Sequence, residues 1–262
     1  MNKISVAIPT YFSSTFINNT INSLKDAEVV DEIVIRDDSE SSSEYKDLDK
    51  IVRSLLEDTE INLTILKNKE NLGGYKNKYR CIELSSNDYV YQIDSDNLAN
   101  PKSLKYLYSM DLDKLDKSVI HIPSRIYLFK KYKNERFINF KKNVKYLKKT
   151  KILDSDDIKK ILLSNEKFVI NKNIDWVLNT GNPFFYKNSY LTSIEKGLSY
   201  SKDTLSADAI AMIYFWTLSG NNVSISKFLS HFHKLRDESY YVTEGATADK
   251  SIAYFKNEFK KI

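Results

Sequence analysis

Two carboxylates, Asp94 and Asp96, directly follow the apolar segment of residues 89–93. Acids two positions apart at the end of a buried strand can both turn into one crevice and share a divalent cation, which prefers oxygen ligands. Ser95 adds a hydroxyl between them. An ordinary acidic turn is the alternative interpretation, because aspartate is common in turns. The position of the pair after a strand favours a metal and phosphate site, with Mn²⁺ or Mg²⁺ as the cation.

Polar groups also follow two earlier strand-like segments. Asp37 and Asp38 come after residues 32–35, and Pro9, Thr10 and Tyr11 end the apolar run of residues 4–8. A carboxylate at such a place can accept hydrogen bonds from the imide N–H of a pyrimidine base and from ribose hydroxyls. Asp-Asp-Ser is also a common helix-capping start, and Pro-Thr-Tyr is also an ordinary loop. We expect nucleoside recognition at these two strand ends.

The elements that must position these residues alternate along the first 100 residues. Strand patterns cover residues 4–8, 32–35, 61–66 and 89–93, and helical spacing covers residues 16–24, 45–56 and 75–84. This order predicts an α/β fold with a mixed, mostly parallel sheet flanked by helices. Ligands of such sheets bind at the carboxyl ends of the strands.

The second half has a less regular pattern. Helices are expected at residues 104–110, 155–163, 206–218 and 249–259, and strands at residues 119–122, 182–186 and 223–225. There is no internal repeat and no linker rich in proline, glycine or serine. We therefore expect one domain over residues 1–262.

The order of these strand ends resembles the GT-A glycosyltransferases, in particular glycosyltransferase family 2. Further likeness comes from the turn at residues 71–74, Asn-Leu-Gly-Gly, with Lys78 behind it, and from the polar run of residues 97–101 that ends in proline. Lys78 stands where the family has arginine, which keeps the charge and loses the planar fork; an exposed lysine on a helix is the alternative. The resemblance covers about residues 3–110.

The resemblance implies a role for each of these positions. Residues 1–110 would form a nucleotide-sugar-binding half, in which Asp37 and Asp38 bind the nucleoside and Lys78 lies near the base or phosphates. Asp94, Ser95 and Asp96 would handle ribose and metal. Asp96 would be the more direct metal ligand of the pair.

Residues 111–262 would then supply the acceptor site and the general base. Asp208 matches the family's base, with Ala207 where glutamate is usual, and Asp203 is the nearest substitute. An acid favoured by a helix N-terminus is the alternative for Asp208. Asn182 and Trp176, beside Asp175, would contact the acceptor, although a packed core tryptophan is the more common outcome.

A late motif, residues 231–236, resembles the family's histidine-containing strand. His233 would complete the metal site, or would be a structural histidine, and Lys234 or Arg236 would offset charge on the departing diphosphate.

The net charge of +5 is concentrated in one segment. Lys130 to Lys151 contains ten basic residues and a single acid, Glu135, interleaved with aromatic residues. This segment fits a peripheral contact with an anionic membrane or a lipid-linked acceptor, and a solvated lysine-rich insertion equally well. No nucleic-acid-binding motif accompanies the charge, so we expect no nucleic acid partner.

Composition excludes several other classes. One cysteine and three histidines exclude a disulfide framework and a thiolate zinc site. The apolar runs are shorter than the roughly 18 residues of a membrane span, and the N-terminus has no signal-peptide pattern. We expect a cytoplasmic protein, and peripheral attachment to the inner face of the membrane is the alternative.

The predicted function is inverting transfer of a sugar from a nucleotide diphosphate donor, UDP favoured, to a hydroxyl acceptor. That acceptor would be a carbohydrate, a lipid-linked glycan or a protein glycan, in bacterial surface polysaccharide, glycolipid or glycan synthesis. Two alternatives remain. A sugar-1-phosphate nucleotidyltransferase would share the sheet, but its glycine-rich phosphate loop is missing after Ile8. A non-catalytic nucleotide- or sugar-binding relative is harder to exclude, because of Ala207.

Overall fold

The computed structural model describes residues 2–129, 131–133, 136–138, 149–163, 178, 182–234 and 245–261. Its strands are β1 (Ile4–Thr10), β2 (Val30–Asp37), β3 (Asn62–Lys67), β4 (Tyr89–Gln92), β5 (Leu98–Ala99), β6 (Val119–Phe129), β7 (Lys131–Lys133), β8 (Arg136–Ile138), β9 (Lys151–Leu153), β10 (Phe184–Tyr186) and β11 (Asn222–Lys234). Its α-helices are α1 (Ile17–Asn22), α2 (Ser42–Leu56), α3 (Gly74–Glu83), α4 (Pro101–Ser109), α5 (Ser155–Leu163), α7 (Lys187–Ile194), α8 (Asp208–Leu218) and α10 (Gly245–Phe259). Two short 3₁₀ helices cover Leu112–Lys114 and Glu195–Ser199.

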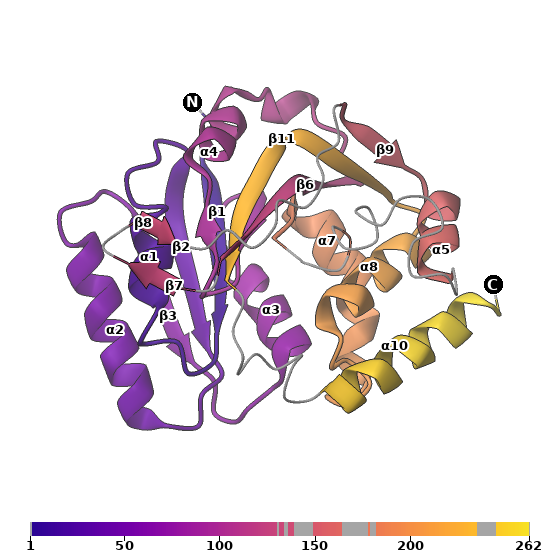
Figure 1. The fold of residues 1–262 in the computed structure, drawn as a ribbon, viewed down its shortest axis with the longest axis horizontal. Coiled ribbons are helices and arrows are strands. Elements are labelled where there is room, and N and C mark those ends of the chain that lie inside the picture. The colour runs from indigo at the N-terminus through magenta and orange to yellow at the C-terminus, as the bar shows by residue number, and fades with distance from the viewer. Residues whose placement is uncertain are drawn as a thin grey trace.

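Most strands join one sheet in the order β3-β2-β1-β4-β10-β6-β11-β5, with β9 added against β11 (Figure 1). The first four strands in sequence are parallel to one another, and their register pairs Thr10 with Asp37 and Asp37 with Lys67. The carboxyl ends of β1 and β2 therefore lie side by side, and β4 ends next to β1. This confirms the predicted mixed, mostly parallel α/β sheet.

Alternating side chains of the strands form two hydrophobic cores, one on each face. Helices α1, α2 and α4 cover one core, and helices α3, α5, α7, α8 and α10 cover the other (Figure 1). Within β4, Tyr89 and Tyr91 enter the first core and Val90 enters the second. Because strand side chains alternate, Gln92 shares a face with Val90, toward α3 and α8.

Two strands extend well beyond their predicted lengths. β6 has 11 residues and β11 has 13, and they run parallel for most of that length. The sequence pattern indicated only residues 119–122 and 223–225, because a register shift between Ser226 and Ser230 interrupts the apolar alternation of β11. Within the described residues, no helix is long and apolar enough to cross a membrane.

Candidate active site

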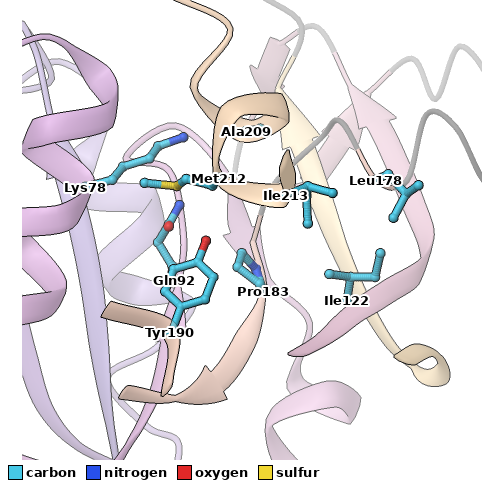
Figure 2. A pocket seen from close by; sticks show the side chains of 9 residues that line it. All are labelled: Lys78, Gln92, Ile122, Leu178, Pro183, Tyr190, Ala209, Met212 and Ile213. Atoms are coloured by element: carbon cyan, nitrogen blue, oxygen red, sulfur yellow. The ribbon is translucent and has the colours of Figure 1, made fainter. Parts of the chain in front are cut away.

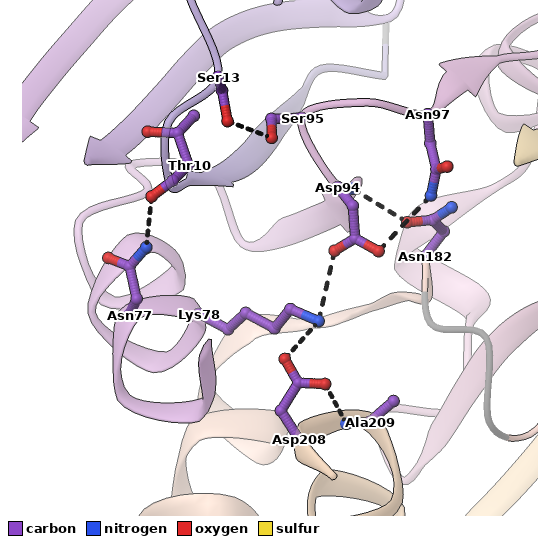
Figure 3. Close-up of polar contacts among 10 residues, drawn as sticks. All are labelled: Thr10, Ser13, Asn77, Lys78, Asp94, Ser95, Asn97, Asn182, Asp208 and Ala209. Carbon is purple, nitrogen blue, oxygen red and sulfur yellow. Dashed lines mark hydrogen bonds and ion pairs between the residues drawn. The ribbon is translucent and has the colours of Figure 1, made fainter. Parts of the chain in front are cut away.

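Lys78 connects two carboxylates that come from distant parts of the sequence. Its Nζ lies 3.3 Å from Asp94 Oδ1 and 2.8 Å from Asp208 Oδ2 (Figure 3). The side chain is only 9% exposed, whereas the two aspartates are about a quarter exposed at 29% and 26%. Burial opposes the charged form of Lys78, but Asp208 and Asp94 outweigh it, so the pKa of Lys78 is raised. Lys78 therefore stays protonated and holds the two acids together.

Asp208 lies between two helix N-termini. It is the first residue of α8, and its Oδ1 accepts a hydrogen bond of 2.6 Å from the Ala209 N–H. Its Oδ2 also packs against the start of α3, where a Cβ added to Gly74 would lie 2.6 Å from that oxygen. Both helix N-termini favour negative charge. Glycine at position 74 is thus what allows the carboxylate to approach α3.

The turn after β4 is fixed by contacts with its neighbours. The Asp94 N–H donates to Asn182 Oδ1 at 3.1 Å, and Thr20 Oγ1 donates to the carbonyl of Ser95 at 2.7 Å. Ser95 Oγ lies 2.8 Å from Ser13 Oγ (Figure 3). These contacts hold the turn, so that Asp94 faces Lys78.

Asn182 lies beneath this turn and is fully buried. Its backbone has a φ of 59°, in the left-handed region that asparagine tolerates better than most residues. A buried side chain that accepts from the Asp94 backbone fits a positioning role. Contact of Asn182 with an acceptor stays a prediction.

The two acids after β2 have different surroundings. The Asp38 carboxylate accepts hydrogen bonds from the N–H groups of Leu72 (2.7 Å) and Gly73 (2.8 Å) and from Asn68 Nδ2 (2.7 Å). Its acceptor positions are therefore engaged in holding the glycine turn before α3. The nucleoside contacts of Asp37 and Asp38 stay predictions.

Asp37 uses only one of its oxygens. Oδ1 accepts from Thr10 Oγ1 at 3.0 Å and Ser39 Oγ at 2.8 Å, while the buried Oδ2 has no hydrogen-bond partner among the described residues. Burial raises the pKa of Asp37 against the opposing effect of these hydroxyl donors. An unsatisfied buried oxygen is costly and marks a place where a ligand donor would be favourable.

Tyr11 and Phe12 present an aromatic surface beside Asp37. Their side chains are 50% and 46% exposed, and the rings meet edge to face with centroids 4.8 Å apart. Phe12 has a φ of 48°, which is unusual for a bulky residue, and its N–H donates to Ser39 Oγ at 2.8 Å. The sequence pattern identified Tyr11 but not Phe12, since nothing in the residue type indicates a left-handed backbone.

The end of β11 lies next to the turn that carries the acid pair. The Lys234 N–H donates to Asn97 Oδ1 at 3.2 Å, and the rings of His231 and His233 are 5.9 Å apart. His231 is fully buried, and burial together with His233 lowers the pKa of His231. His231 is therefore neutral, and His233 is the member of the pair with more exposure.

The donor set fits a metal only when a phosphate ligand is added. No cluster of three or more His, Cys, Asp or Glu side chains suitable for a metal occurs among the described residues. Asp94 and the largely buried Asp96 offer carboxylate oxygens from one turn. Mg²⁺ typically takes one or two protein carboxylates and completes its shell with phosphate and water. The residues present thus fit a cation held jointly with a bound diphosphate.

A small cavity lies behind Lys78, between β4 and α8. Figure 2 shows Gln92 and Tyr190 on the Lys78 side of this cavity and apolar side chains around the rest. The space available to a water-sized sphere is about 20 Å³, which suits one water molecule. A sugar ring is far larger. The cavity therefore suits a water molecule and not a group of that size.

Several predicted positions lie outside the described residues. These are Asp175, Trp176, Arg236 and most of the segment from Lys130 to Lys151. Their predicted roles in acceptor, diphosphate and membrane contact stay predictions.

Fold and site together define a GT-A type α/β protein, with polar groups gathered where the parallel strands end. A model of the family described as glycosyl transferase family 2 matches residues 5–176. The chain belongs to this family, whose description supports the predicted enzyme class, a glycosyltransferase. No curated protein matches the sequence.

Solved structures show the same fold at low identity. Residues 1–349 of TarS from S. aureus in complex with UDP-GlcNAc are 16% identical, with a TM-score of 0.59, over 97% of this chain and 66% of that chain. The complex of the same TarS fragment with UDP is 19% identical, with a TM-score of 0.57, over 97% and 65%. This chain thus spans slightly less than two thirds of the length of those structures.

Proposed function

We propose that this protein transfers a sugar from a nucleoside diphosphate donor, with uridine favoured as the nucleoside, to a hydroxyl acceptor with inversion at the anomeric carbon. The observation that carries the proposal is the Asp94–Lys78–Asp208 cluster. It joins the end of a sheet strand suited to phosphates and metal to a carboxylate at a helix start suited to proton removal. Family membership supports the reaction class.

In this proposal Asp208 acts as the general base. The acceptor oxygen attacks the anomeric carbon as its proton passes to Asp208, and the bond from that carbon to the diphosphate breaks. The electron pair leaves with the diphosphate. Attack from the face opposite the leaving group inverts the configuration, and a fixed base at this position removes the entropic cost of bringing one from solution.

The nucleoside would bind over the ends of β1 and β2. Tyr11 offers a ring for stacking, and Asp37 Oδ2 is the oxygen that lacks a donor. An imide N–H of uracil supplies such a donor. The TarS structures contain UDP-GlcNAc and UDP, which supports uridine as the first nucleoside to test. Pro9 and Thr10 shape this strand end, and Thr10 holds Asp37 in place.

Lys78 would exchange partners during the reaction. Without donor it neutralises Asp94 and Asp208, and a bound diphosphate offers a third anion at the same place. A shift of Lys78 toward the diphosphate would stabilise the developing charge on the leaving group and free Asp208 to accept a proton. A lysine suits this exchange, since a flexible point charge is less tied to one geometry than the fork of arginine.

Asp94 and Asp96 are the residues proposed to hold a divalent cation jointly with the donor diphosphate. The contribution of His233 stays a prediction, because the described part of the chain contains no group of three such ligands. When bound, the cation would neutralise charge on the diphosphate oxygens. The proposed organisation assigns residues 1–110 to donor binding and residues 111–262 to the acceptor and base. A role in surface polysaccharide, glycolipid or glycan synthesis at the cytoplasmic side of the membrane is the proposed setting.

The test is a panel of nucleotide sugars incubated with the purified protein and Mn²⁺, Mg²⁺ or EDTA. Release of nucleoside diphosphate and the thermal shift are read from the same wells. We expect one uridine donor to raise the melting temperature and to release UDP slowly with metal. Asp96→Ala should abolish the metal-dependent release of UDP, and Asp203→Asn should leave that release intact. Absence of binding for every nucleotide would contradict the proposal.

Stereochemistry gives an independent check once an acceptor is found. The anomeric configuration of the product, read by proton NMR from an α-linked donor, should be β. An α product would exclude a single displacement assisted by Asp208.

A further inference from the structure

Two exposed apolar side chains lie on the edge formed by α4, β9 and β11, and belong to no feature of the candidate active site. Phe228 is 48% exposed and Ile152 is 63% exposed. The other large apolar side chains with such exposure in the described part of the chain are Tyr11 and Phe12 at the nucleoside end and Leu66 on β3. These two side chains therefore place apolar surface on this edge. Figure 1 shows where α4, β9 and β11 lie in the fold.

Phe228 is held outward by specific contacts. It lies within the register shift of β11, where the Ser230 N–H donates to Ser103 Oγ of α4 at 2.8 Å. Its ring stacks on Tyr106 of α4 with centroids 4.6 Å apart and planes at 25°. The Lys227 Nζ also lies 4.6 Å from the Phe228 ring centroid. The exposed ring is thus part of a fixed aromatic pair.

The strand β9 continues the same surface. The Lys227 N–H donates to Thr150 Oγ1 at 3.3 Å, and Ile152 pairs with Ser224 in the β9–β11 ladder. We call residues 102–106, 149–152 and 227–228 together the rim patch. Its three segments come from three different parts of the sequence and meet through these contacts.

The rim patch has a single sign of charge. It contains five lysines and no acid: Lys102, Lys105, Lys149, Lys151 and Lys227. All but Lys151 are exposed, and Lys151 is half-buried. The nearest acid in sequence, Asp154, follows β9 and caps the start of α5, where its Oδ1 accepts from the Asp157 N–H at 2.8 Å. Its one negative charge offsets only part of the five lysines. The patch therefore attracts anions.

We propose that the rim patch docks the protein on an anionic lipid surface. Phe228 and Ile152 would enter the interfacial region, where aromatic and aliphatic side chains are favourable, while the lysines face lipid phosphates. A soluble polyanion would match the charge but would leave both apolar side chains in water. An anionic lipid surface contacts both the lysines and the two apolar side chains. This inference is independent of the chemistry proposed for the active site.

The test is sedimentation of the full chain with phosphatidylcholine vesicles, with and without phosphatidylglycerol. We expect binding only to vesicles that contain phosphatidylglycerol, and weaker binding in high salt. Lys102→Gln with Lys105→Gln should weaken binding by about 30-fold, from roughly 1 kcal/mol for each lysine near the surface. The matched control is Lys46→Gln with Lys50→Gln on the exposed side of α2, which should bind as the unaltered protein does.

A second measurement separates lipid insertion from charge attraction alone. Phe228→Trp should be quenched by brominated lipid tails on binding, and Leu66→Trp on β3 should not be. Equal binding by the two lysine double variants would overturn the proposal. Charge-dependent binding without quenching at position 228 would also overturn it, and would indicate a polyanion as the partner.

Discussion

Lys78 is the residue on which the candidate site depends most strongly. A buried ammonium is tolerated only where anions compensate its lost hydration. Here two aspartates from different elements provide that compensation, and each is itself fixed by a backbone contact. Lys78 therefore links two elements structurally, and it also provides the positive charge that is proposed to stabilise the leaving diphosphate. These two roles can be separated by substitution.

Lys78→Met should lower the free energy of unfolding by about 2 kcal/mol, less than the 3–5 kcal/mol for a fully buried pair because both acids are partly exposed. Urea unfolding at neutral pH measures this loss. Since the folded-state pKa of Lys78 is raised, its stabilisation is present throughout the range below its ordinary pKa near 10.5. The difference between variant and parent should be constant from pH 6 to about 9. Lys76→Met in the same helix is the control, and an equal loss there would refute a special role for Lys78.

Asp38 and Asp37 should differ in what their loss does. Asp38→Ala removes the acceptor for the Leu72 and Gly73 N–H groups, and we expect a loss of about 2–4 kcal/mol in unfolding free energy. Asp37→Ala should weaken nucleotide binding more than it weakens the fold. Thermal melts with and without UDP distinguish the two effects. A larger nucleotide-binding defect for Asp38→Ala would reverse this assignment.

At the scale of elements, the N-terminus of α3 lies against both the glycine turn of residues 71–74 and Asp208, the proposed base. Gly74 is in ordinary helical backbone, so its importance lies in the space it leaves for Asp208. The contrast is Gly197, where an added Cβ would lie 2.1 Å from the Tyr75 hydroxyl, which itself donates to the Ile194 carbonyl. Gly74 leaves room for the carboxylate of the proposed base, and Gly197 leaves room for a packed tyrosine.

Gly74→Ala should therefore reduce the transfer rate by about tenfold, because the base carboxylate must shift, with little change in melting temperature. Gly197→Ala should lower the melting temperature strongly, since a buried tyrosine must move. Steady-state kinetics and thermal melts on both variants measure the two effects. An unchanged rate for Gly74→Ala would show that the approach of Asp208 to α3 is irrelevant to the reaction.

The sequence predicted the elements of the first half well, because apolar alternation and helical spacing are local signals. All four parallel strands and the three helices between them occur close to their expected places. The long strands β6 and β11 were underestimated, since the bulge at Ser226–Ser230 and polar residues such as Ser124 break their alternation. Register shifts depend on the partner strand, which a local pattern does not contain.

The site was predictable in its residue types but not in its contacts. The order of the strand ends indicated Thr10, Asp37 and Asp94 as neighbours, and the family resemblance placed Lys78 near the same ligand. The pairing of Lys78 with Asp208 could not be predicted, because it depends on how α8 packs against α3 more than a hundred residues away. Likewise, Asp38 as a turn-holding acid and Asn182 as a support for Asp94 follow only from the three-dimensional arrangement.

At the scale of the whole molecule, the fold is expected to be sensitive to acid because it contains a partly buried imidazole, His121. The ring centroids of His121 on β6 and Phe184 on β10 lie 6.1 Å apart. Burial lowers the pKa of His121 to about 4, and Asp116 opposes this shift only in part. The fold therefore prefers the neutral imidazole. Its contribution to stability is complete above the ordinary pKa near 6.5 and declines as the pH falls toward 4.

The unfolding free energy should consequently fall by roughly 2 kcal/mol between pH 7 and 4.5 through His121. His121→Gln should remove this part of the pH dependence. Denaturant unfolding of the parent and the variant at several pH values in that range gives the slope of unfolding free energy against pH for each protein. Identical slopes would mean that other groups govern the acid sensitivity.

The central claim is that Asp208 is the base of a sugar transfer whose donor binds over the strand ends. The most direct measurement is the single-turnover transfer rate of Asp208→Asn, taken together with the donor dissociation constant, against the exposed neighbour Asp203→Asn. We predict a loss of about 10²–10⁴-fold in rate for Asp208→Asn with donor affinity changed by less than about threefold, and a normal rate for Asp203→Asn. A normal rate for Asp208→Asn, at unchanged donor affinity, would contradict the account.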